Sequence, residues 1–333
     1  MSVWLPVAPC TPADCAAPQW PTVGRLTAIT RLVAGILAVL AGVLLSPSAI
    51  LLGPAGRARL VGLWCRTVIR AFGVRIRIVG PEPGAAQVPG PRRAPDGGPV
   101  EGPAVTPQAG TLVVPNHISW LDIPLVAGVL PGRMLAKKEV RQWPVLGPLA
   151  RFGGTLFVDR DRLRALPGVV ATMADALRAG ARVIVFPEGS TWCGRERGRF
   201  RNAAFQAAID AGAAVQPVRI TYRPVGAAAF VGEDPLAASL WRVASAGGLT
   251  AEIRILPPIP AGRHTDRRSL ARAAHTAMAD DADAVTGHIF HTGHVVHPAQ
   301  TAVDSDRANL PASSVHHSDI FSPASASSAR TPS

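Results

Sequence analysis

A long apolar segment near the N-terminus constrains this 333-residue chain more than any other feature. Residues 32–45 carry no charge, a Ser-Pro-Ser break around Pro47 follows, and the apolar run then resumes until Gly53. Taken across the break, the segment spans about 22 residues, close to the roughly 20 that a helix needs to cross a bilayer. A transmembrane helix, a helical hairpin that enters and leaves one leaflet, and a cleaved signal peptide are the three interpretations.

The charges around this segment favour the hairpin slightly over the single span. Arginines stand on both sides of the apolar run, so the sequence gives no inside–outside asymmetry, at Arg25, Arg31, Arg57 and Arg59. In each interpretation except the signal peptide, the segment anchors the chain to a membrane.

The charge balance predicts anionic partners. The formal net charge is +12, which suits an anionic membrane or a phosphorylated or CoA-bearing substrate. Nucleic acid is disfavoured because the chain has one Tyr and nine Phe for stacking on bases, and its arginines are spread along the sequence.

The cysteines and histidines predict no metal site and no disulfide framework. None of Cys10, Cys15, Cys65 and Cys193 forms a CxxC pair, so each is interpreted as a small buried or incidental residue. This usage fits a reducing environment and places the protein on the cytoplasmic face of the cell membrane. A run of histidines at every third position lies in a polar tail and favours disorder over metal binding, at His288, His291, His294 and His297.

Composition divides the chain into six segments. Helical spacing of apolar residues among arginines predicts an interfacial basic helix just after the anchor, and the alternation in residues 74–79 predicts a strand. The segments are a flexible N-terminus (1–23), a membrane-anchoring helical segment (24–56), an interfacial helix and strand (57–80), a Pro/Gly-rich loop (81–110), an α/β domain (111–284) and a disordered tail (285–333).

Within residues 111–284, strand-like and helix-like segments alternate, which predicts an α/β fold with a mixed sheet flanked by helices. Apolar runs predict strands at residues 112–114, 155–158, 183–186, 215–220 and 251–256. Apolar residues at helical spacing predict helices near residues 166–178, 202–211 and 267–283.

The first candidate catalytic pair, His117 and Asp122, follows the predicted strand at residues 112–114. On a continuous helix, residues five apart would point about 140° away from each other. If His117 lies on the turn that leaves the strand and Asp122 in the first helical turn, the carboxylate can reach Nδ1 and make Nε2 a base. The chain has no GxSxG elbow, and Ser119 lacks an oxyanion loop, so a substrate hydroxyl is the expected nucleophile.

Two further motifs place charge where a strand ends. Arg160, at the end of a glycine-led strand that begins at Gly154, can clamp a phosphate or can simply pair with a neighbouring aspartate. The motif Phe-Pro-Glu-Gly-Ser at residues 186–190 puts a carboxylate and a glycine turn at a sheet edge, where ligands of open α/β sheets bind. Arg195 and the arginines after it can neutralise phosphate or CoA charge, or form a solvated loop.

Four motifs in this order resemble the glycerolipid acyltransferase family, whose best-known members acylate lysophosphatidic acid. The resemblance covers residues 112–220. Its blocks are Asn116-His117-x-Ser119-x-x-Asp122, Gly154-x-x-Phe157-Val158-Asp159-Arg160, Phe186-Pro187-Glu188-Gly189-Ser190 and Val215-Gln216-Pro217-Val218.

The resemblance implies a fold like that of the glycerol-phosphate acyltransferases, with a membrane-seated two-helix segment ahead of the catalytic domain. His117 would deprotonate a lysophospholipid hydroxyl and Asp122 would hold the imidazole. The alkoxide would attack acyl-CoA or acyl-carrier protein, giving phosphatidic acid from 1-acylglycerol 3-phosphate in phospholipid biosynthesis, without a cofactor or a metal. The implied substrate-binding residues are Asn116, Ser119, Gly154, Arg160, Glu188, Gly189, Ser190 and Arg195.

One departure from the family pattern concerns the acceptor. Family members usually carry an arginine two residues after the glycine of the third block, and this chain has Thr191 there. Arg195 can substitute for it, or the acceptor lacks a phosphate in that place. Acylation of a lyso-aminolipid or of glycerol 3-phosphate by the same catalytic pair is the alternative among enzymes. A non-catalytic lipid-binding protein of the same fold is the alternative from another class, and retention of both His117 and Asp122 argues against it.

Overall fold

The computed structural model describes most of the chain ahead of the tail. The predicted Pro/Gly-rich loop, apart from Gly110, and Arg160 lie outside the described residues, as does the tail from residue 292 onward. The chain divides into two units, residues 1–288 and 289–333, and nearly all described residues belong to the first. The described ranges are 8–17, 19–80, 110–144, 146–159 and 162–291.

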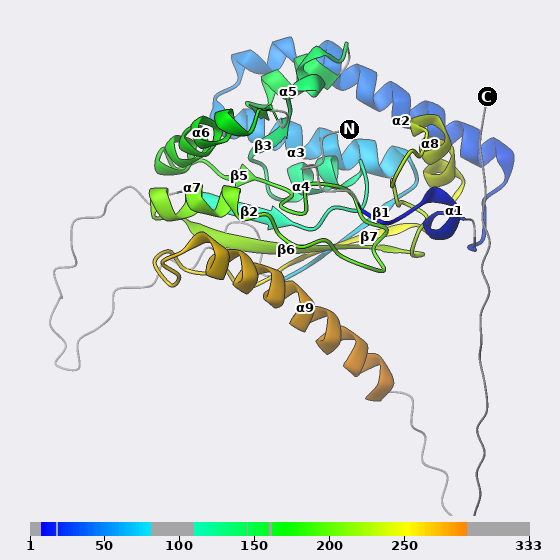
Figure 1. Cartoon of the computed structure of the whole chain (residues 1–333). Coiled ribbons are helices and arrows are strands. Elements are labelled where there is room, and N and C mark those ends of the chain that lie inside the picture. The colour runs from blue at the N-terminus through cyan, green and yellow to red at the C-terminus, as the bar shows by residue number, and fades with distance from the viewer. Residues whose placement is uncertain (1–7, 18, 81–109, 145, 160–161, 292–333) are drawn as a thin grey trace, which may run out of the picture. The chain divides into compact units, whose positions relative to one another are not determined.

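Seven strands in the described part of the chain form one mixed sheet in the order β1-β7-β6-β2-β5-β3-β4 (Figure 1). Every neighbouring pair is parallel except β6 and β7, which are antiparallel. The mixed α/β architecture that the sequence predicts is therefore confirmed. The strands are β1 (Arg75–Val79), β2 (Thr111–Pro115), β3 (Arg133–Lys137), β4 (Leu156–Val158), β5 (Val183–Ile184), β6 (Ala214–Arg223) and β7 (Thr250–Ile255).

Helices cover both faces of this sheet. On the central strand β2, Val113 faces one hydrophobic cluster while Leu112 and Val114 face the other, as the alternation of a strand buried on both faces requires. The described helices are α1 (Pro12–Cys15), α2 (Arg25–Leu45), α3 (Pro54–Ala71), α4 (Asp122–Val129), α5 (Leu146–Phe152), α6 (Leu166–Arg178), α7 (Ala203–Ala211), α8 (Leu236–Ser245) and α9 (Arg267–His291), with 3-10 turns η1 (Pro47–Leu51), η2 (Lys138–Gln142) and η3 (Leu163–Ala165).

The first cluster contains residues of α3, α4 and α8, and the second contains residues of α6, α7 and α9. Figure 1 shows α3 and α9 on opposite sides of the sheet. The carboxyl ends of the parallel strands β2, β5, β3 and β4 meet at one edge, which brings the predicted motifs to the same side of the molecule.

The predicted elements coincide with observed ones at most positions, and the differences have local causes. The helix at residues 166–178 has the predicted bounds, whereas α9 extends to His291, past the predicted end at residue 283 and into the predicted tail. Strand β3 and helices α5 and α8 were not predicted. β3 has the sequence Arg-Met-Leu-Ala-Lys, whose three consecutive apolar residues between two charges show no alternation.

Pro217 lies inside β6, and this strand pairs with β2 on one side and β7 on the other. Because proline has no N–H, Pro217 cannot donate a hydrogen bond to either neighbouring strand. The neighbouring side chain compensates, because the Gln216 amide donates to the carbonyl oxygens of Leu256 and Pro217. The Pro217 carbonyl in turn accepts from the Leu256 N–H at 3.2 Å. In the fourth motif, the side-chain amide of Gln216 therefore supplies the hydrogen-bond donor that Pro217 lacks in its backbone.

The N-terminus differs from the predicted flexible lead-in. Cys10, Cys15 and Trp20 are buried, and Thr11 caps the short helix α1 through the Asp14 N–H. The segment then follows the end of α8, where the Val23 N–H donates to the Ser245 carbonyl at 2.8 Å. Its Pro- and Ala-rich sequence has no periodicity that would indicate this packing.

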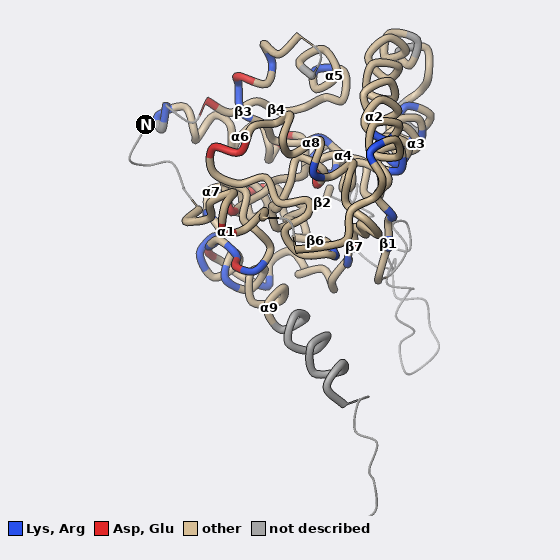
Figure 2. The backbone as a smooth tube through the Cα atoms, turned by 90° about the vertical axis from the view of Figure 1, so that its right-hand side faces the viewer, with Lys and Arg blue, Asp and Glu red and all other residues tan. Residues whose placement is uncertain are grey.

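Helices α2 and α3 form a packed pair on either side of the Pro47 break, and Figure 2 shows them side by side. The Trp64 indole N–H donates to the Ala38 carbonyl at 2.7 Å. Glycines let the aromatic rings approach α2, because a Cβ on Gly35 would lie 2.4 Å from the Phe72 ring and one on Gly42 would lie 2.1 Å from Trp64. This pair corresponds to the two-helix segment that the family resemblance implies ahead of the catalytic domain.

Helix α3 is more deeply integrated than the interfacial helix that the sequence predicts. Cys65, Val68 and Ile69 are buried, and the helix packs against α4. Arg66, one of the arginines of this helix, donates from Nε to the Gly128 carbonyl at 2.7 Å. The outer face of α3 keeps Arg59 and Leu63 exposed.

The outer face of α2 is apolar and open. In the described part of the chain, this 21-residue helix is the one that is long and apolar enough to cross a membrane. Leu37 and Leu44 are 58% and 79% exposed, although such side chains normally gain about 1.5–3 kcal/mol from burial. An exposed apolar face of this size is typical of a surface that contacts a membrane or another protein.

We predict that Gly35→Ala destabilises the helix pair, because the added methyl group has no room beside the buried Phe72 ring. The expected loss is about 1–3 kcal/mol in the free energy of unfolding, measured by chemical denaturation in detergent. Gly168→Ala in α6 is the matched control: nothing lies within 4 Å of its added Cβ, and we expect a gain of up to about 1 kcal/mol. Equal stability of Gly35→Ala and wild type would contradict the packing of α2 on Phe72.

Candidate active site

His117 stands at the exit of β2 with its ring fixed on one edge and one face. Its Nδ1 lies 2.9 Å from Oδ2 of Asp122, and its ring stacks on Phe186 with centroids 4.2 Å apart. Asp122 is the first residue of α4, as the spacing predicted. With the Nδ1–H donating to the carboxylate, Nε2 carries the lone pair that can accept a proton.

The Asp122 carboxylate is fully buried and receives four donors. Oδ2 accepts from the backbone N–H groups of Ile118 and Ser119 at 2.6 and 2.8 Å, in addition to the imidazole. Oδ1 accepts from the Tyr222 hydroxyl at 2.6 Å. The carboxylate is thus held by the turn that precedes it and by a strand one hundred residues away.

Tyr222 is the site residue that the sequence analysis missed. It is fully enclosed in the protein, and burial, together with the negative charge of Asp122, raises its pKa well above the usual value, so it remains a phenol donor. It belongs to the alternation Val218, Ile220, Tyr222 on one face of β6, and it is the chain's one tyrosine. Pro115, the last residue of β2, pairs with Val218, and β6 continues for five more residues. The end of β6 therefore lies beside the β2–α4 turn, where Tyr222 reaches Asp122.

Glu188 supports the backbone of His117. Its Oε2 accepts from the His117 N–H at 2.7 Å, and its Oε1 accepts from the Gly198 N–H at 3.1 Å. Burial raises the pKa of this carboxyl to about 8, and the nearby charge of Asp122 adds to the increase, while the two backbone hydrogen bonds oppose it. Both oxygens bind the protein's own backbone, so Glu188 positions His117, and its role in shaping an acceptor pocket stays a prediction.

Asn116 and Ser119, also expected to bind substrate, are buried behind the site. The Asn116 side-chain amide donates to the Ile220 carbonyl at 3.0 Å and accepts from the Ile220 N–H at 2.7 Å, which adds one rung to the β2–β6 ladder. Ser119 is fully buried, and its Oγ accepts from the Leu121 N–H at 3.3 Å. In the described structure, both side chains bind the protein's own backbone.

The loop that follows Glu188 fixes the other side of His117. The backbone N–H of Trp192 donates to the His117 carbonyl at 2.7 Å. Gly189 has a φ of 78°, which suits the turn at the end of the Phe-Pro-Glu-Gly-Ser motif. The Ser190 Oγ is buried and has no hydrogen-bond partner among the described residues.

The arginines and the threonine of this loop bind main-chain carbonyls. Arg195 donates to the Asp14 carbonyl at 3.0 Å and Arg197 donates to the Met278 carbonyl at 2.7 Å. Thr191 donates its hydroxyl to the Phe230 carbonyl. Arg195 is therefore placed against the N-terminal segment, which the sequence alone did not indicate.

The second motif lies at the far end of the sheet. Gly154 forms the turn before β4 with a φ of 68°, and its carbonyl accepts from Arg133 Nε at 2.8 Å. Asp159, just after β4, pairs with Lys138 at 2.8 Å. Two strands separate β4 from β2, so with neighbouring strands about 4.8 Å apart the two motifs lie on the order of 14 Å from each other along the edge. Arg160 lies outside the described residues.

Comparisons with known proteins agree on one family. The family model "Acyltransferase" matches residues 99–221. A lyso-ornithine lipid O-acyltransferase of Pseudomonas aeruginosa is 39% identical over 180 residues, which is 52% of this chain and 67% of that protein. A 1-acyl-sn-glycerol-3-phosphate acyltransferase of Neisseria gonorrhoeae is 36% identical over 194 residues, which is 54% of this chain and 74% of that protein.

A longer match and a solved structure extend the comparison. A lyso-ornithine lipid O-acyltransferase of Brucella abortus is 33% identical over 233 residues, covering 65% of this chain and 79% of that protein. The crystal structure of the 1-acyl-sn-glycerophosphate acyltransferase of Thermotoga maritima superposes with a TM-score of 0.57 at 17% identity, covering 78% of this chain and 95% of that one. That structural likeness concerns the fold.

A buried carboxylate that orients an imidazole at the edge of a mixed sheet is an arrangement suited to general base catalysis. The chain belongs to the acyltransferase family. It is an acyltransferase of the lysolipid type, and the exposed apolar helix α2 together with these relatives indicates membrane association.

We predict that Tyr222→Phe lowers kcat while leaving the KM of both substrates near wild type, because the phenol acts only through Asp122. Losing a hydrogen bond to a buried carboxylate should also cost about 1.5–3 kcal/mol of unfolding free energy. Steady-state kinetics and denaturation of the purified variant measure both effects. A wild-type kcat would show that the hydroxyl has no part in positioning His117.

Proposed function

We propose that this enzyme transfers a fatty acyl group from acyl-CoA or acyl-carrier protein to the free hydroxyl of a lysophospholipid. The observation that carries the proposal is the 2.9 Å contact between His117 Nδ1 and the fully buried Asp122 carboxylate. A base oriented in this way, with no hydroxyl or thiol hydrogen-bonded to the imidazole among the described residues, suits direct attack by an acceptor hydroxyl.

In the proposed reaction, His117 Nε2 removes the proton of the acceptor hydroxyl as the oxygen attacks the thioester carbonyl. The resulting tetrahedral intermediate collapses, the C–S bond breaks, and the leaving thiolate takes the proton from the imidazolium. The Asp122 carboxylate stabilises the imidazolium between these two steps. Protons and electron pairs balance among acceptor, thioester and imidazole, so the proposal includes no metal or redox cofactor.

The acceptor that we propose first is 1-acylglycerol 3-phosphate, which would give phosphatidic acid. The relative from Neisseria gonorrhoeae is named for this activity. In the sequence, Arg160 comes two residues after the end of β4 at Val158, and the carboxyl end of β4 lies at the same sheet edge as that of β2. A guanidinium there would bind the phosphate of the acceptor.

A second candidate acceptor is a lyso-ornithine lipid, and the geometry of the loop after Glu188 favours it. Thr191 stands where the family usually has arginine, and its hydroxyl binds the Phe230 carbonyl. Arg195 and Arg197 donate to main-chain carbonyls, so these arginines are engaged within the protein. Relatives from Pseudomonas aeruginosa and Brucella abortus are named for this acceptor.

We also propose that the α2–α3 pair seats the enzyme in the cytoplasmic leaflet of the cell membrane. The exposed leucines of α2 provide the apolar face, and a net charge of +12 favours an anionic surface. All four cysteines are free, which suits the reducing side of the membrane. A lipid acceptor could then enter the site from the leaflet without leaving it.

The membrane proposal predicts that replacing Leu37 and Leu44 together with glutamate weakens vesicle binding by at least about tenfold, since each leucine contributes about 1.5–3 kcal/mol when buried. Flotation with phosphatidylglycerol-containing vesicles measures it. Ile78→Glu, which changes an exposed apolar residue of β1, is the control and should bind as wild type. Undiminished binding of the double variant would contradict the proposal.

Protease digestion of membrane vesicles tests the cytoplasmic face. The protease should digest the domain in inverted vesicles but not in right-side-out vesicles.

The catalytic proposal predicts that His117→Ala keeps its fold but transfers acyl groups at least about 10²- to 10⁴-fold more slowly than wild type, because the general base is gone. Membranes containing wild type or variant receive labelled acyl-CoA or acyl-carrier protein with 1-acylglycerol 3-phosphate, glycerol 3-phosphate or lyso-ornithine lipid. Product formed by wild type alone identifies the acceptor. Equal signals from the two proteins with every donor and acceptor would favour a non-catalytic lipid-binding role.

The same assay tests the phosphate clamp. Arg160→Ala should raise the KM for 1-acylglycerol 3-phosphate and leave that for a lyso-ornithine lipid unchanged. An unchanged KM for the phosphate acceptor would remove Arg160 from the proposal without affecting His117.

A further inference from the structure

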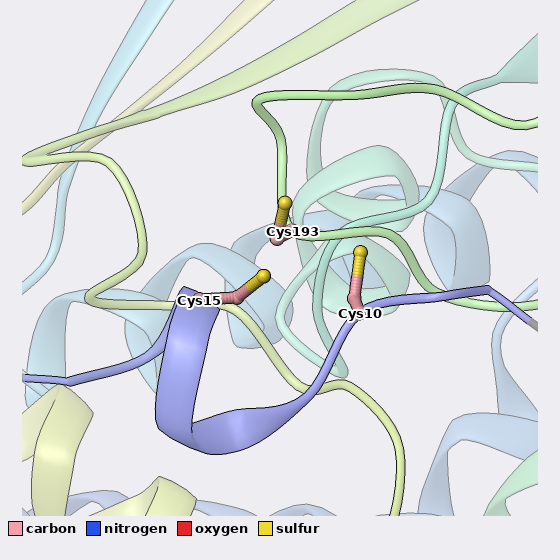
Figure 3. A group of neighbouring side chains, drawn as sticks. All are labelled: Cys10, Cys15 and Cys193. Atoms are coloured by element: carbon pink, nitrogen blue, oxygen red, sulfur yellow. The ribbon is translucent and has the colours of Figure 1, made fainter. Parts of the chain in front are cut away.

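The fold gathers three cysteines at a place outside the catalytic pair. The sulfur atoms of Cys10, Cys15 and Cys193 all lie within 4.8 Å of one another, and all three side chains are buried (Figure 3). Cys10 precedes helix α1 and Cys15 is its last residue, while Cys193 comes from the loop after Glu188. The prediction that these cysteines are small buried residues is confirmed, and the sequence did not indicate that three of them lie together.

This spacing matches the requirements of one tetrahedral metal ion. With Zn–S bonds of about 2.3 Å, tetrahedral geometry puts sulfur ligands about 3.8 Å apart, so thiols this close need to move by no more than about 1 Å. All three are free thiols in the structure. Among the described residues, no other Cys, His, Asp or Glu joins the group, which leaves one position for water.

We propose that Cys10, Cys15 and Cys193 bind one soft divalent metal ion of the Zn²⁺ class through three thiolates. Thiolate sulfur is the ligand that such ions prefer, and three protein ligands with a fourth open position is an established zinc coordination. Binding would release the thiol protons.

The surroundings of Cys193 support the proposal. Burial by itself raises the pKa of this thiol, but the backbone N–H groups of Arg195 and Glu196 and the thiols of Cys15 and Cys10 lower it overall. Burial raises the pKa of Cys10 to about 12. One sulfur of the three is therefore already surrounded by donors that stabilise its anionic form.

The ion would connect the N-terminal segment to the loop that supports the catalytic base. Within that loop, the Trp192 N–H binds the His117 carbonyl and the Gly198 N–H binds Glu188. Arg195 already links the loop to α1 through the Asp14 carbonyl at 3.0 Å. A metal ion at the three thiols would add a second, stronger connection, so its role would be structural and separate from acyl transfer.

The test uses the full chain, purified in detergent with reductant and stripped of metal by a chelator. Titration with Co²⁺ should show binding of one equivalent and a thiolate-to-cobalt charge-transfer band. The band should disappear when Zn²⁺ replaces Co²⁺. Zn²⁺ should also raise the melting temperature, since an ion that binds the folded state stabilises it by mass action. Cys193→Ala should lose the band and weaken Zn²⁺ binding by at least about tenfold.

Cys65→Ala is the matched control, because Cys65 is a buried free cysteine of α3 outside the group. It should bind Co²⁺ and Zn²⁺ as wild type does. Wild type that binds neither ion, or Cys193→Ala that binds as wild type, would overturn the proposal. A disulfide between any two of the three cysteines in protein that binds no metal after reduction would overturn it as well.

Alkylation of wild type keeps the proposal testable if Cys193→Ala does not fold. With iodoacetamide and mass spectrometry, Zn²⁺ should protect Cys10, Cys15 and Cys193 and leave the labelling of Cys65 unchanged. Equal labelling of the three with and without Zn²⁺ would contradict the site.

Discussion

A carboxylate that leaves water must find donors for its oxygens, and in this protein that requirement is concentrated on Asp122. Its donors come from the β2–α4 turn, the His117 ring and the end of β6. They converge only if β2, α4 and β6 keep one relative position. The geometry of the catalytic base is therefore the geometry in which this buried charge is satisfied, and any shift among the three elements would leave a donor or an acceptor unpaired.

A second layer of contacts holds His117 from outside the turn. Glu188 binds its N–H, Trp192 binds its carbonyl and Phe186 lies against its ring. All three belong to the segment that follows β5, so the third sequence motif serves the first one structurally. Through Arg195 the same segment reaches the N-terminal helix α1, which makes the ordering of the N-terminus part of the support of the site.

The helix pair α2–α3 is coupled to the catalytic carboxylate through α4. Helix α3 packs on α4, where Arg66 binds the Gly128 carbonyl near the end of the helix that begins at Asp122. The apolar outer face of α2 and the catalytic turn are thus parts of one packed unit. This packing connects the exposed apolar face of α2 to the turn that carries His117 and Asp122.

The sequence by itself determined the features that depend on local periodicity and on the chemistry of adjacent residues. These are the α/β order of elements, the apolar helix near the N-terminus, and the His-x4-Asp pair across a strand-to-helix turn. The tertiary structure decided the rest. Tyr222 reaches Asp122 only because β6 continues past β2, and Glu188 and Asn116 turn inward because buried backbone groups there need partners. The three-cysteine group likewise depends on where the packed N-terminus meets a distant loop. Contacts between residues so far apart follow from strand register and packing, which leave no periodic trace in the sequence.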